Sequence, residues 1–562
     1  MTGPAHPLRV GLLLDEPVIP WWLVGALRAA IDEGTITVVL AVLRASTPPP
    51  TEVPKPVRWW RNRNRLMHEL YERVEAHRTF GSPPPPDIAL TDLATAIPVL
   101  EVTPRTTTFS DRVDATDIER IRAHRPDLLI RIGFRILRGE ILSAVPGGVW
   151  SFHHGDNRGG PPCTWEVLED LPVTGITLQR LTEDLDGGEV LDRAVIATRR
   201  FSLSKTRSSL YRKSSPLLLH ALRRAHRDGI PAAAAVGQSA EGWVSHDHHL
   251  HGTPTNRQML ERLLRLGWSY LRERLGSNGK VWHWSLAWEM GPPSDSPSGP
   301  FHDYREITPP PDRYWADPFP VHQDGRWWIF FEQYRFADAR GTICVLEMSQ
   351  KGPVGEPTEV LTEPFHLSYP HVFRYGQEWY MLPDSTEAGD LRLYRAQKFP
   401  DQWTFERTIK GVQGADPTLL EWDGLWYLFV AGGDADYGRS EELNIFLAET
   451  PFGPFRPHPE NPVVRDVRCA RMAGRFFFDG GRLYRPAQVA APFYGKGIRI
   501  MRVEEISPIR YREVLHAEIT ARWRPGLLGM HTLNAAHGLS AVDLLRRSKI
   551  ARTRSGPAPG PP

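Results

Sequence analysis

The chain has 562 residues, which exceeds the size at which a single hydrophobic core keeps growing, so we expect two or more domains. Its hydrophobic content of 41% and charged content of 24% are typical of globular proteins. A formal net charge of +2 gives no reason to expect nucleic acid or an anionic membrane surface as a partner.

Cysteine content and hydropathy narrow the class of protein further. Cys163, Cys344 and Cys469 lie far apart, so they predict neither a disulfide framework nor a zinc site, and we expect no metal. No apolar run reaches the roughly 18 residues that a membrane span requires. Asp15 and Glu16 end the first apolar run too early for a signal peptide. We therefore expect a cytoplasmic protein, of undetermined oligomeric state.

Residues 1–235 alternate short apolar runs with amphipathic stretches, the pattern of an α/β domain with a Rossmann-like parallel sheet. The strands that we expect are Arg9–Leu14, Thr37–Leu43, Asp127–Ile132 and Gly148–His153, and the helices are Trp22–Glu33 and Asp114–His124. In such sheets ligands collect beyond the carboxyl ends of the strands. His153 ends the fourth strand, so it is a candidate functional residue.

Chemistry-bearing residues are concentrated between Gly148 and Leu191. A histidine with a nearby carboxylate supplies a proton shuttle, because the carboxylate fixes the imidazole tautomer and stabilises its charged form. His153 and Asp186 are suited to these roles. The hydroxyl of Ser151 can donate a hydrogen bond to a developing oxyanion. His154 is a poorer candidate for that role, since adjacent residues on a strand face opposite sides.

The order of His153, Arg158-Gly159, Thr174-Gly175-Ile176-Thr177 and Leu185-Asp186-Gly187-Gly188 resembles the active-site half of the folate-dependent formyltransferases, such as the methionyl-tRNA and amino-sugar formyltransferases. The family's catalytic asparagine position holds Ser151 here, and the loop after His153 is shorter. The resemblance implies 10-formyltetrahydrofolate as the formyl donor and His153, Asp186 and Ser151 as catalytic residues. It further implies folate contacts at Leu185, Gly187, Gly188 and Leu137, and acceptor contacts at Arg158 and Gly159.

Residues 236–279 are expected to form a linker followed by a helix. The linker contains His246, His248, His249 and His251, which we interpret as a solvated histidine-rich segment. The pattern of Arg and Leu predicts an amphipathic helix over Asn256–Leu275.

Residues 280–540 have a different composition, with short aromatic strands and a weak repeat. The four units begin at Ala316-Asp317-Pro318, Ser368-Tyr369-Pro370, Ala415-Asp416-Pro417 and Ala470-Arg471-Met472, and each leads to an aromatic strand such as DGRWWIFFE or DGLWYLFVA. A spacing of about 45–55 residues is typical of one four-stranded propeller blade. With the flanking strands, the sequence predicts a five-bladed β-propeller. Residues 541–562 are basic and then rich in Pro and Gly, so we expect a disordered tail.

The Ala-Asp-Pro units resemble the five-bladed propellers of arabinanase- and β-xylosidase-type glycoside hydrolases, and also the propeller attached to plant sphingolipid glycosyltransferases. The resemblance implies a sugar-recognising surface, with Asp317 and Asp416 as candidate substrate-binding residues. Glycosidases use two carboxylates as acid and as base or nucleophile. Glu332, Asp384 and Glu387 are further candidate acids, although an inner-strand Asp can equally bond backbone amides in a turn.

Together the two halves favour transfer of a formyl group from 10-formyltetrahydrofolate to the amine of a small, sugar-containing acceptor, such as an amino sugar or an aminoglycoside-like metabolite. Three alternatives stay open: related acyl transfer or formyl hydrolysis at an altered site, glycoside hydrolysis or glycan binding by the propeller, and a scaffold without catalysis.

Overall fold

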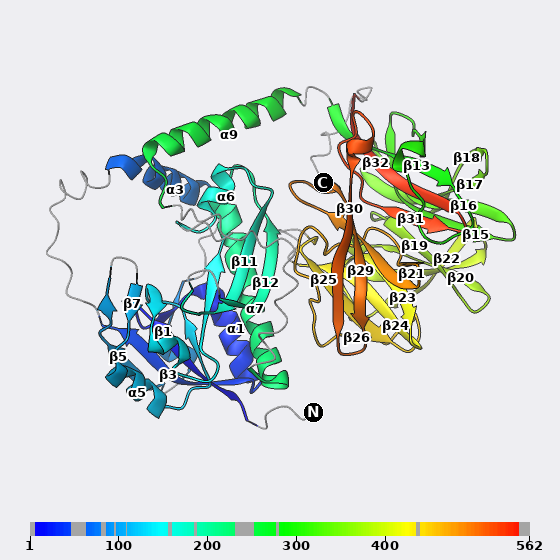
Figure 1. The fold of residues 1–562 in the computed structure, drawn as a ribbon. Helices are drawn as coiled ribbons and strands as arrows, with labels where there is room; N and C mark the ends of the chain where they lie inside the picture. Colours follow the sequence, from blue (N-terminus) through cyan, green and yellow to red (C-terminus); the bar gives the residue numbers. More distant parts are fainter. Residues whose placement is uncertain are drawn as a thin grey trace. The chain divides into compact units, whose positions relative to one another are not determined.

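The computed structural model describes residues 6–45, 63–79, 86–94, 97–107, 110–155, 160–184, 188–230, 252–276, 280–433 and 439–549. It divides into two compact units, Met1–Ser269 and Tyr270–Pro562 (Figure 1). The boundary between the units falls within helix α9 (Asn256–Gly276). This helix agrees with the one expected over Asn256–Leu275. Within the described residues, no helix combines the length and the apolar character needed to cross a membrane.

The first unit is an α/β domain built on a seven-stranded sheet. Its strand order is β12 (Glu189–Ala197), β11 (Val173–Arg180), β10 (Val149–His154), β8 (Leu128–Arg131), β1 (Leu8–Leu14), β3 (Ile36–Arg44) and β5 (Val99–Val102). The strands from β10 to β5 pair in parallel, whereas β11 and β12 add an antiparallel edge. The predicted parallel sheet and its four predicted strands are confirmed.

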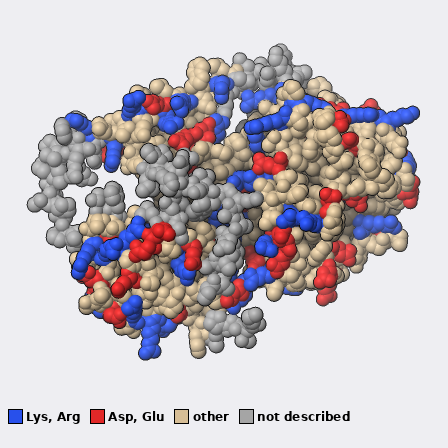
Figure 2. All heavy atoms as spheres, viewed as in Figure 1, with Lys and Arg blue, Asp and Glu red and all other residues tan. Residues whose placement is uncertain are grey.

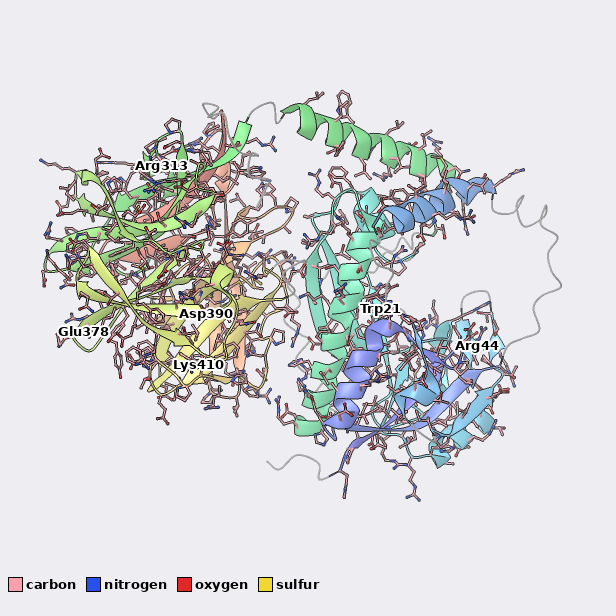
Figure 3. All side chains as sticks on the ribbon, turned by 180° about the vertical axis from the view of Figure 1, so that it is seen from behind. Trp21, Arg44, Arg313, Glu378, Asp390 and Lys410 are labelled. Atoms are coloured by element: carbon pink, nitrogen blue, oxygen red, sulfur yellow. The ribbon has the colours of Figure 1, made fainter. Side chains whose placement is uncertain are left out.

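The helices of this unit cover the sheet because their apolar residues recur at helical spacing. In α1 (Trp21–Asp32) the buried residues are Leu23, Ala26, Leu27 and Ala30, a stripe along one face. Helix α7 (Leu203–Asp228) lies against α1, where the hydroxyl of Ser215 accepts from the amide of Ala26 at 3.1 Å (Figure 3). The further elements are α3 (Leu66–Thr79), α4 (Leu90–Leu93), α5 (Ala115–Ala123), α6 (Thr164–Leu168), β2 (Val18–Ile19), β4 (Ile88–Ala89), β6 (Arg105–Thr106), β7 (Ser110–Arg112) and β9 (Ile136–Arg138).

The second unit is all-β, and its described residues form five four-stranded antiparallel sheets. The first sheet joins both ends of the unit: β14 (Arg305–Ile307), β13 (Lys280–Met290), β32 (Leu539–Lys549) and β31 (Leu533–Ala536). The second is β15 (Arg313–Gln323) to β18 (Gly352–Leu361), through β16 (Arg326–Arg335) and β17 (Arg340–Ser349). The third sheet contains β19 (Ser368–Tyr375), β20 (Glu378–Asp384), β21 (Leu391–Lys398) and β22 (Gln402–Ile409). The fourth contains β23 (Ala415–Trp422), β24 (Leu425–Gly432), β25 (Glu442–Ala448) and β26 (Arg456–Pro457). The fifth contains β27 (Phe477–Asp479), β28 (Arg482–Val489), β29 (Gly497–Ile506) and β30 (Tyr511–Thr520).

Three of the four repeat units predicted from the sequence share one backbone feature. Near the start of β15, β19 and β23, the pairing with the next strand shifts register. The residues at these shifts, Asp317, Tyr369 and Asp416, have left-handed φ values of 52°, 45° and 52°. Each shift is a β-bulge, so the repeat in sequence is also a repeat in structure. In the fourth unit, Met472 makes only an isolated bridge to Ala487.

The tail expected over 541–562 is wrong in its first part. Residues 541–549 belong to β32, which pairs along its length with β13. The apolar residues Val542, Leu544 and Leu545 are fully buried, and this burial outweighs the basic character of the residues after them. The second unit therefore extends beyond 540. Residues 550–562 and most of the histidine-rich linker, 231–251, lie outside the described residues.

Basic and acidic side chains are interspersed over the face of the described residues drawn in Figure 2. This distribution fits the formal net charge of +2.

Candidate functional site

Strand β10 presents the predicted catalytic residues Ser151 and His153 on one face of the sheet and His154 on the other. Phe152 and His154 stack on each other with ring centroids 5.4 Å apart, so they share one face. Both contact Trp22 of α1. Ser151 and His153 alternate with them along the strand and therefore point to the other face. These contacts place His154 on the face that α1 covers, and the alternation of a strand puts His153 on the other face.

His154 is a buried structural residue. Its Nε2 lies 3.0 Å from the hydroxyl of Ser214 on α7, and its ring meets that of Tyr211 edge-on. Burial, together with the nearby charge of His153, lowers the pKa of His154 to about 3. His154 is consequently neutral at physiological pH and takes no part in proton transfer on the opposite face.

Ser151 is 2% exposed, and its hydroxyl is held by an arginine. Nη1 of Arg131, at the end of the neighbouring strand β8, donates to Ser151 Oγ at 2.9 Å. Nε and Nη2 of the same guanidinium donate to the carbonyls of Arg135 and Phe134 at 3.1 and 2.9 Å. The structure thus pairs Ser151 with a positively charged group at the carboxyl ends of two parallel strands, where ligands bind in such sheets.

The loop after β8 is built to hold this arginine. Phe134 has a left-handed φ of 65°, and its amide donates to the carboxylate of Asp15 at 2.9 Å. The amide of Arg135 donates to Asp111 at 3.0 Å. Burial lowers the pKa of Arg131 below its ordinary value, and the carboxylates of Asp15 and Asp111 offset only part of this shift. Arg131 was not among the site residues predicted from the sequence. The only sequence feature that marks it is its position directly after the buried run Leu128–Ile130.

Five predicted site residues lie outside the described residues, namely Arg158, Gly159, Leu185, Asp186 and Gly187. Gly188 is described, and a Cβ there would lie 2.8 Å from Oε1 of Gln179, so the strand edge is tightly packed at this point. Leu137, on β9, is 2% exposed and packs in the core with Val149. Its predicted folate contact stays a prediction.

The carboxylate of Glu166 lies close to the end of β10. Glu166 of α6 is buried, and its Oε1 lies 2.7 Å from the position that a Cβ of Gly155 would occupy. Gly155 directly follows β10 and has a left-handed φ of 114°. Only glycine allows this close approach without displacing the carboxylate.

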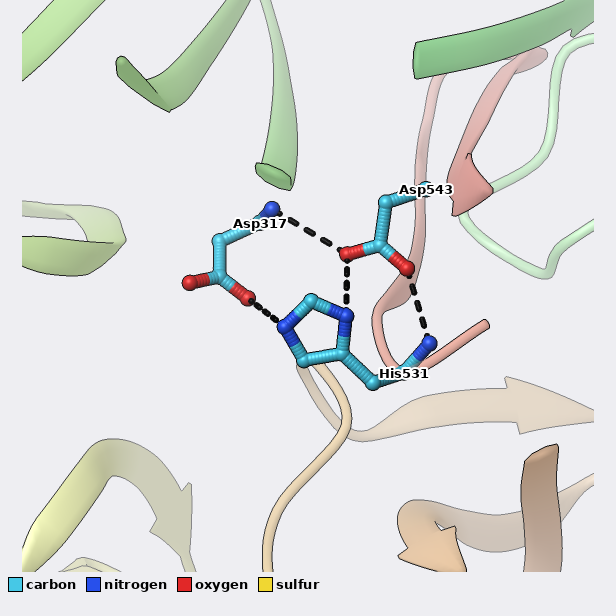
Figure 4. A group of neighbouring side chains, drawn as sticks. All are labelled: Asp317, His531 and Asp543. Carbon is cyan, nitrogen blue, oxygen red and sulfur yellow. Dashed lines mark hydrogen bonds and ion pairs between the residues drawn. The ribbon is translucent and has the colours of Figure 1, made fainter. Parts of the chain in front are cut away.

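In the second unit, Asp317 belongs to a buried ion cluster with His531 and Asp543 (Figure 4). His531 Nε2 lies 3.2 Å from Asp317, and Nδ1 lies 2.8 Å from Asp543. The two carboxylates raise the pKa of His531 to about 10, despite its burial. The three side chains could offer ligand atoms to a metal ion, but a protonated imidazole does not bind metal. The described geometry favours an imidazolium between two carboxylates.

Asp416 lies in a comparable setting. Its carboxylate accepts from Nε of Arg471 at 2.5 Å and from Nε2 of Gln488 at 2.9 Å. Its own amide donates to Asp384 at 3.1 Å, as the amide of Tyr369 donates to Asp317 at 3.1 Å. The carboxylates of Asp317 and Asp384 therefore each bind the bulge of the following sheet. The substrate contacts predicted for Asp317 and Asp416 stay predictions.

The pKa values of Glu332 and Asp317 are shifted in opposite directions. Burial and the nearby carboxylate of Asp317 raise the pKa of Glu332 well above its ordinary value. His531 and Thr532 lower the pKa of Asp317, although burial opposes them. Tyr314 donates to Glu332 at 3.2 Å. The pKa values of these two carboxyl groups are therefore shifted in opposite directions, as in pairs that serve acid–base chemistry.

The first group of similar proteins matches the second unit. A family model described as glucosamine inositolphosphorylceramide transferase 1, N-terminal, matches residues 305–536, in the second unit. Proteins of that name from Oryza sativa subsp. japonica and Arabidopsis thaliana are 37% and 36% identical to this chain over 209 residues. The rice match covers 36% of this chain and 28% of the rice protein. The chain thus spans less than a third of the length of these relatives.

Other matches concern formyltransferases and glycoside hydrolases. A methionyl-tRNA formyltransferase from Bacillus thuringiensis is 30% identical over 112 residues, which cover 19% of this chain and 35% of that protein. Among solved structures, a family 117 glycoside hydrolase of Zobellia galactanivorans covers 47% of this chain and is itself covered to 91%, with 14% identity and a TM-score of 0.31. Glycinamide ribonucleotide transformylase 1 of Symbiobacterium toebii covers 39% and is covered to 88%, with 17% identity and a TM-score of 0.26.

Proposed function

We propose that the first unit transfers a formyl group from 10-formyltetrahydrofolate to an amine. The observation that supports this most is the placement of His153 and the Arg131–Ser151 pair on one face of the sheet, where β8 and β10 end. The sequence similarity to methionyl-tRNA formyltransferase supports the same chemistry. The formyl donor itself supplies the electrophilic carbon. The protein then has to accept the proton of the attacking amine and stabilise the negative charge that develops on the formyl oxygen.

His153 would accept the proton that the amine loses as its nitrogen bonds to the formyl carbon, and would return it to the departing nitrogen. Asp186 would orient the imidazole and stabilise its charged form. Ser151 would donate to the oxyanion, in place of the family's asparagine. Because Arg131 donates to Ser151 Oγ, it directs the hydroxyl proton away from itself and strengthens Ser151 as a donor. Leu137, Leu185, Gly187 and Gly188 would border the folate.

We propose an amino sugar as the acceptor, and five propeller blades as the arrangement of the five sheets in the second unit. The plant relatives of this unit carry glucosamine in their name, which supports a sugar-bearing acceptor with a free amine. Arg158 and Gly159 would contact this acceptor in the first unit. Asp317 and Asp416 would contact a saccharide that the second unit binds by itself.

The test is a product assay with 10-formyltetrahydrofolate and glucosamine, galactosamine or UDP-glucosamine, read by mass spectrometry as the formylated amine. His153→Ala should lower turnover by roughly 100-fold or more. His124→Ala, a histidine at the end of α5 in the same unit, serves as the control and should leave turnover unchanged. Formate release without any amine would replace transfer by formyl hydrolysis, and product formation unaffected by His153→Ala would refute the proposal.

A second candidate function is glycoside hydrolysis in the second unit. It is favoured by one observation, the raised pKa of Glu332 beside the lowered pKa of Asp317. Glu332 would protonate the leaving oxygen, and Asp317 would act as base or nucleophile. Under this hypothesis, Asp317→Asn and Glu332→Gln each abolish cleavage of p-nitrophenyl glycosides. Formyl transfer that survives both substitutions would assign catalysis to the first unit.

A further inference from the structure

A cavity of about 550 Å³ opens between the fourth and fifth sheets of the second unit. Trp422, at the end of β23, stacks on Phe478 of β27, with ring centroids 6.0 Å apart and planes 17° from parallel. The remaining lining residues are Gly481, Arg482, Leu483, Arg502, Val503, Glu504, Glu505 and Ile506. This volume lies within the usual range of small-molecule sites.

Phenylalanine fills the seam between the second and third sheets and the seam between the third and fourth sheets. Phe399, in the turn between β21 and β22, packs against Trp328 of the preceding sheet at 5.2 Å and against Trp379 at 4.8 Å. Phe452, in the turn between β25 and β26, packs against Tyr375 and Tyr380 of the preceding sheet at 5.2 and 5.1 Å. Each phenylalanine thus closes the seam towards the sheet before its own.

The fifth sheet lacks this closure. Its corresponding turn between β29 and β30 reads Ser-Pro-Ile-Arg (507–510), without an aromatic residue, and Ile509 is 65% exposed. The second position of the repeat's aromatic strand is also smaller there. Trp327, Trp379 and Trp426 occupy it in the second, third and fourth sheets, and Leu483 in the fifth. Two large side chains are therefore missing at one seam, and the cavity takes their place.

The chemistry of the walls indicates the occupant. A flat aromatic pair presents a stacking surface for the apolar face of a ring, and Phe478 is 53% exposed for that purpose. Two arginines and two glutamates surround it, so the rim offers donors and acceptors in balanced number and no excess of charge. Arg502 and Glu504 pair with each other at the edge. A neutral ring that carries many hydroxyl groups satisfies both the stacking surface and the rim.

We propose that this seam cavity is a saccharide-binding site, separate from Ser151 and His153 and from Asp317 and Asp416. Asp416 and Trp422 lie at opposite ends of β23, so the cavity opens away from the buried carboxylates of the inner strand. Binding there does not depend on formyl transfer by the first unit. The site would hold a pyranose of a glycan that the protein docks on.

The experiment is saturation-transfer NMR and calorimetry on the full chain with chitobiose, cellobiose and xylobiose as probes. At least one disaccharide is expected to bind. Phe478→Ala should weaken it about tenfold, in line with the loss of a stacking contact. Leu483→Trp restores the tryptophan of the other sheets and should abolish binding while the melting temperature is kept. Phe405→Ala is the matched control, because Phe405 lies outside the cavity and is 52% exposed.

Two results would overturn the proposal. The first is the absence of binding by all three disaccharides at their highest soluble concentrations. The second is binding that Phe478→Ala and Leu483→Trp leave unchanged. A wild-type dimer that Leu483→Trp dissociates, without saccharide binding, would make the cavity an interface between two copies of the chain and would also overturn it.

Discussion

Replacing His531 by glutamine removes the cation that separates two buried carboxylates. Asp317 and Asp543 would then lie in a site where His531 is 3% exposed, with no positive charge between them. Breaking a buried ion pair by removing one partner typically costs about 3–5 kcal/mol, since the remaining charge is left uncompensated. We therefore expect His531→Gln to destabilise the second unit by about that amount at neutral pH.

The pKa of His531 gives a second route to the magnitude and fixes its pH dependence. The pKa is raised in the folded state to about 10, from an ordinary value of 6.5. The stabilisation is therefore complete below pH 6.5 and is lost as the pH rises through 10. At about 1.4 kcal/mol per pH unit, linkage over this window gives roughly 5 kcal/mol. The two estimates, about 3–5 and roughly 5 kcal/mol, agree. They describe the same ion cluster, so they are not added.

Differential scanning calorimetry at several pH values between 6 and 10 measures the effect. For a unit of this size, 1 kcal/mol shifts the melting temperature by about 2–4 °C, so the variant should melt about 10 °C below wild type at pH 7. The gap should narrow towards pH 10, because wild type then loses the same charge. His302→Gln, whose side chain is 66% exposed, is the matched control. A gap below about 2 °C at pH 7, or one that stays constant to pH 10, would refute the reasoning.

Three further predictions follow from buried groups. Arg131→Met should lower formyl transfer about tenfold or more, since Ser151 loses its charged partner, and kinetics with unchanged circular dichroism would establish this. Arg485→Met should destabilise the second unit by about 3–5 kcal/mol in urea unfolding, because it leaves the carboxylate of Glu513 buried without its cation. Gly474→Ala should cost more than about 2 kcal/mol in the same assay, because its Cβ would lie 2.2 Å from the carbonyl of Leu533 at a φ of 138°.

The sequence predicted the parallel sheet because its strands contain continuous apolar runs, such as Val10–Leu14, that burial on both faces explains. It also predicted the opposite orientations of His153 and His154, since alternation along a strand is independent of tertiary context. Arg131 was not predicted as a site residue because a basic residue at the end of a strand is usually solvent-exposed. What makes it special is its contact with Ser151, twenty positions later, which no local pattern encodes.

The cluster around His531 was missed for a related reason. Asp317 and Asp543 are 226 positions apart, and they meet only because the first sheet takes strands from both ends of the unit. The sequence analysis ended the second domain at 540, so Asp543 fell into a segment that basic composition marked as a tail. A pattern confined to neighbouring residues cannot reveal a contact that depends on closing the whole unit.

The position of Asp317 in the repeat argues for a structural role that is independent of any chemistry. A left-handed residue in each bulge turns its amide towards the preceding sheet, and Asp543, Asp317 and Asp384 accept from Asp317, Tyr369 and Asp416 respectively. The tyrosine in the middle position shows that the bulge itself does not require a carboxylate on its own residue. What it requires is a carboxylate in the sheet before it. An aspartate recurring at this place is therefore weak evidence for a glycosidase site, whereas Glu332, whose pKa burial raises, accepts from none of these bulge amides.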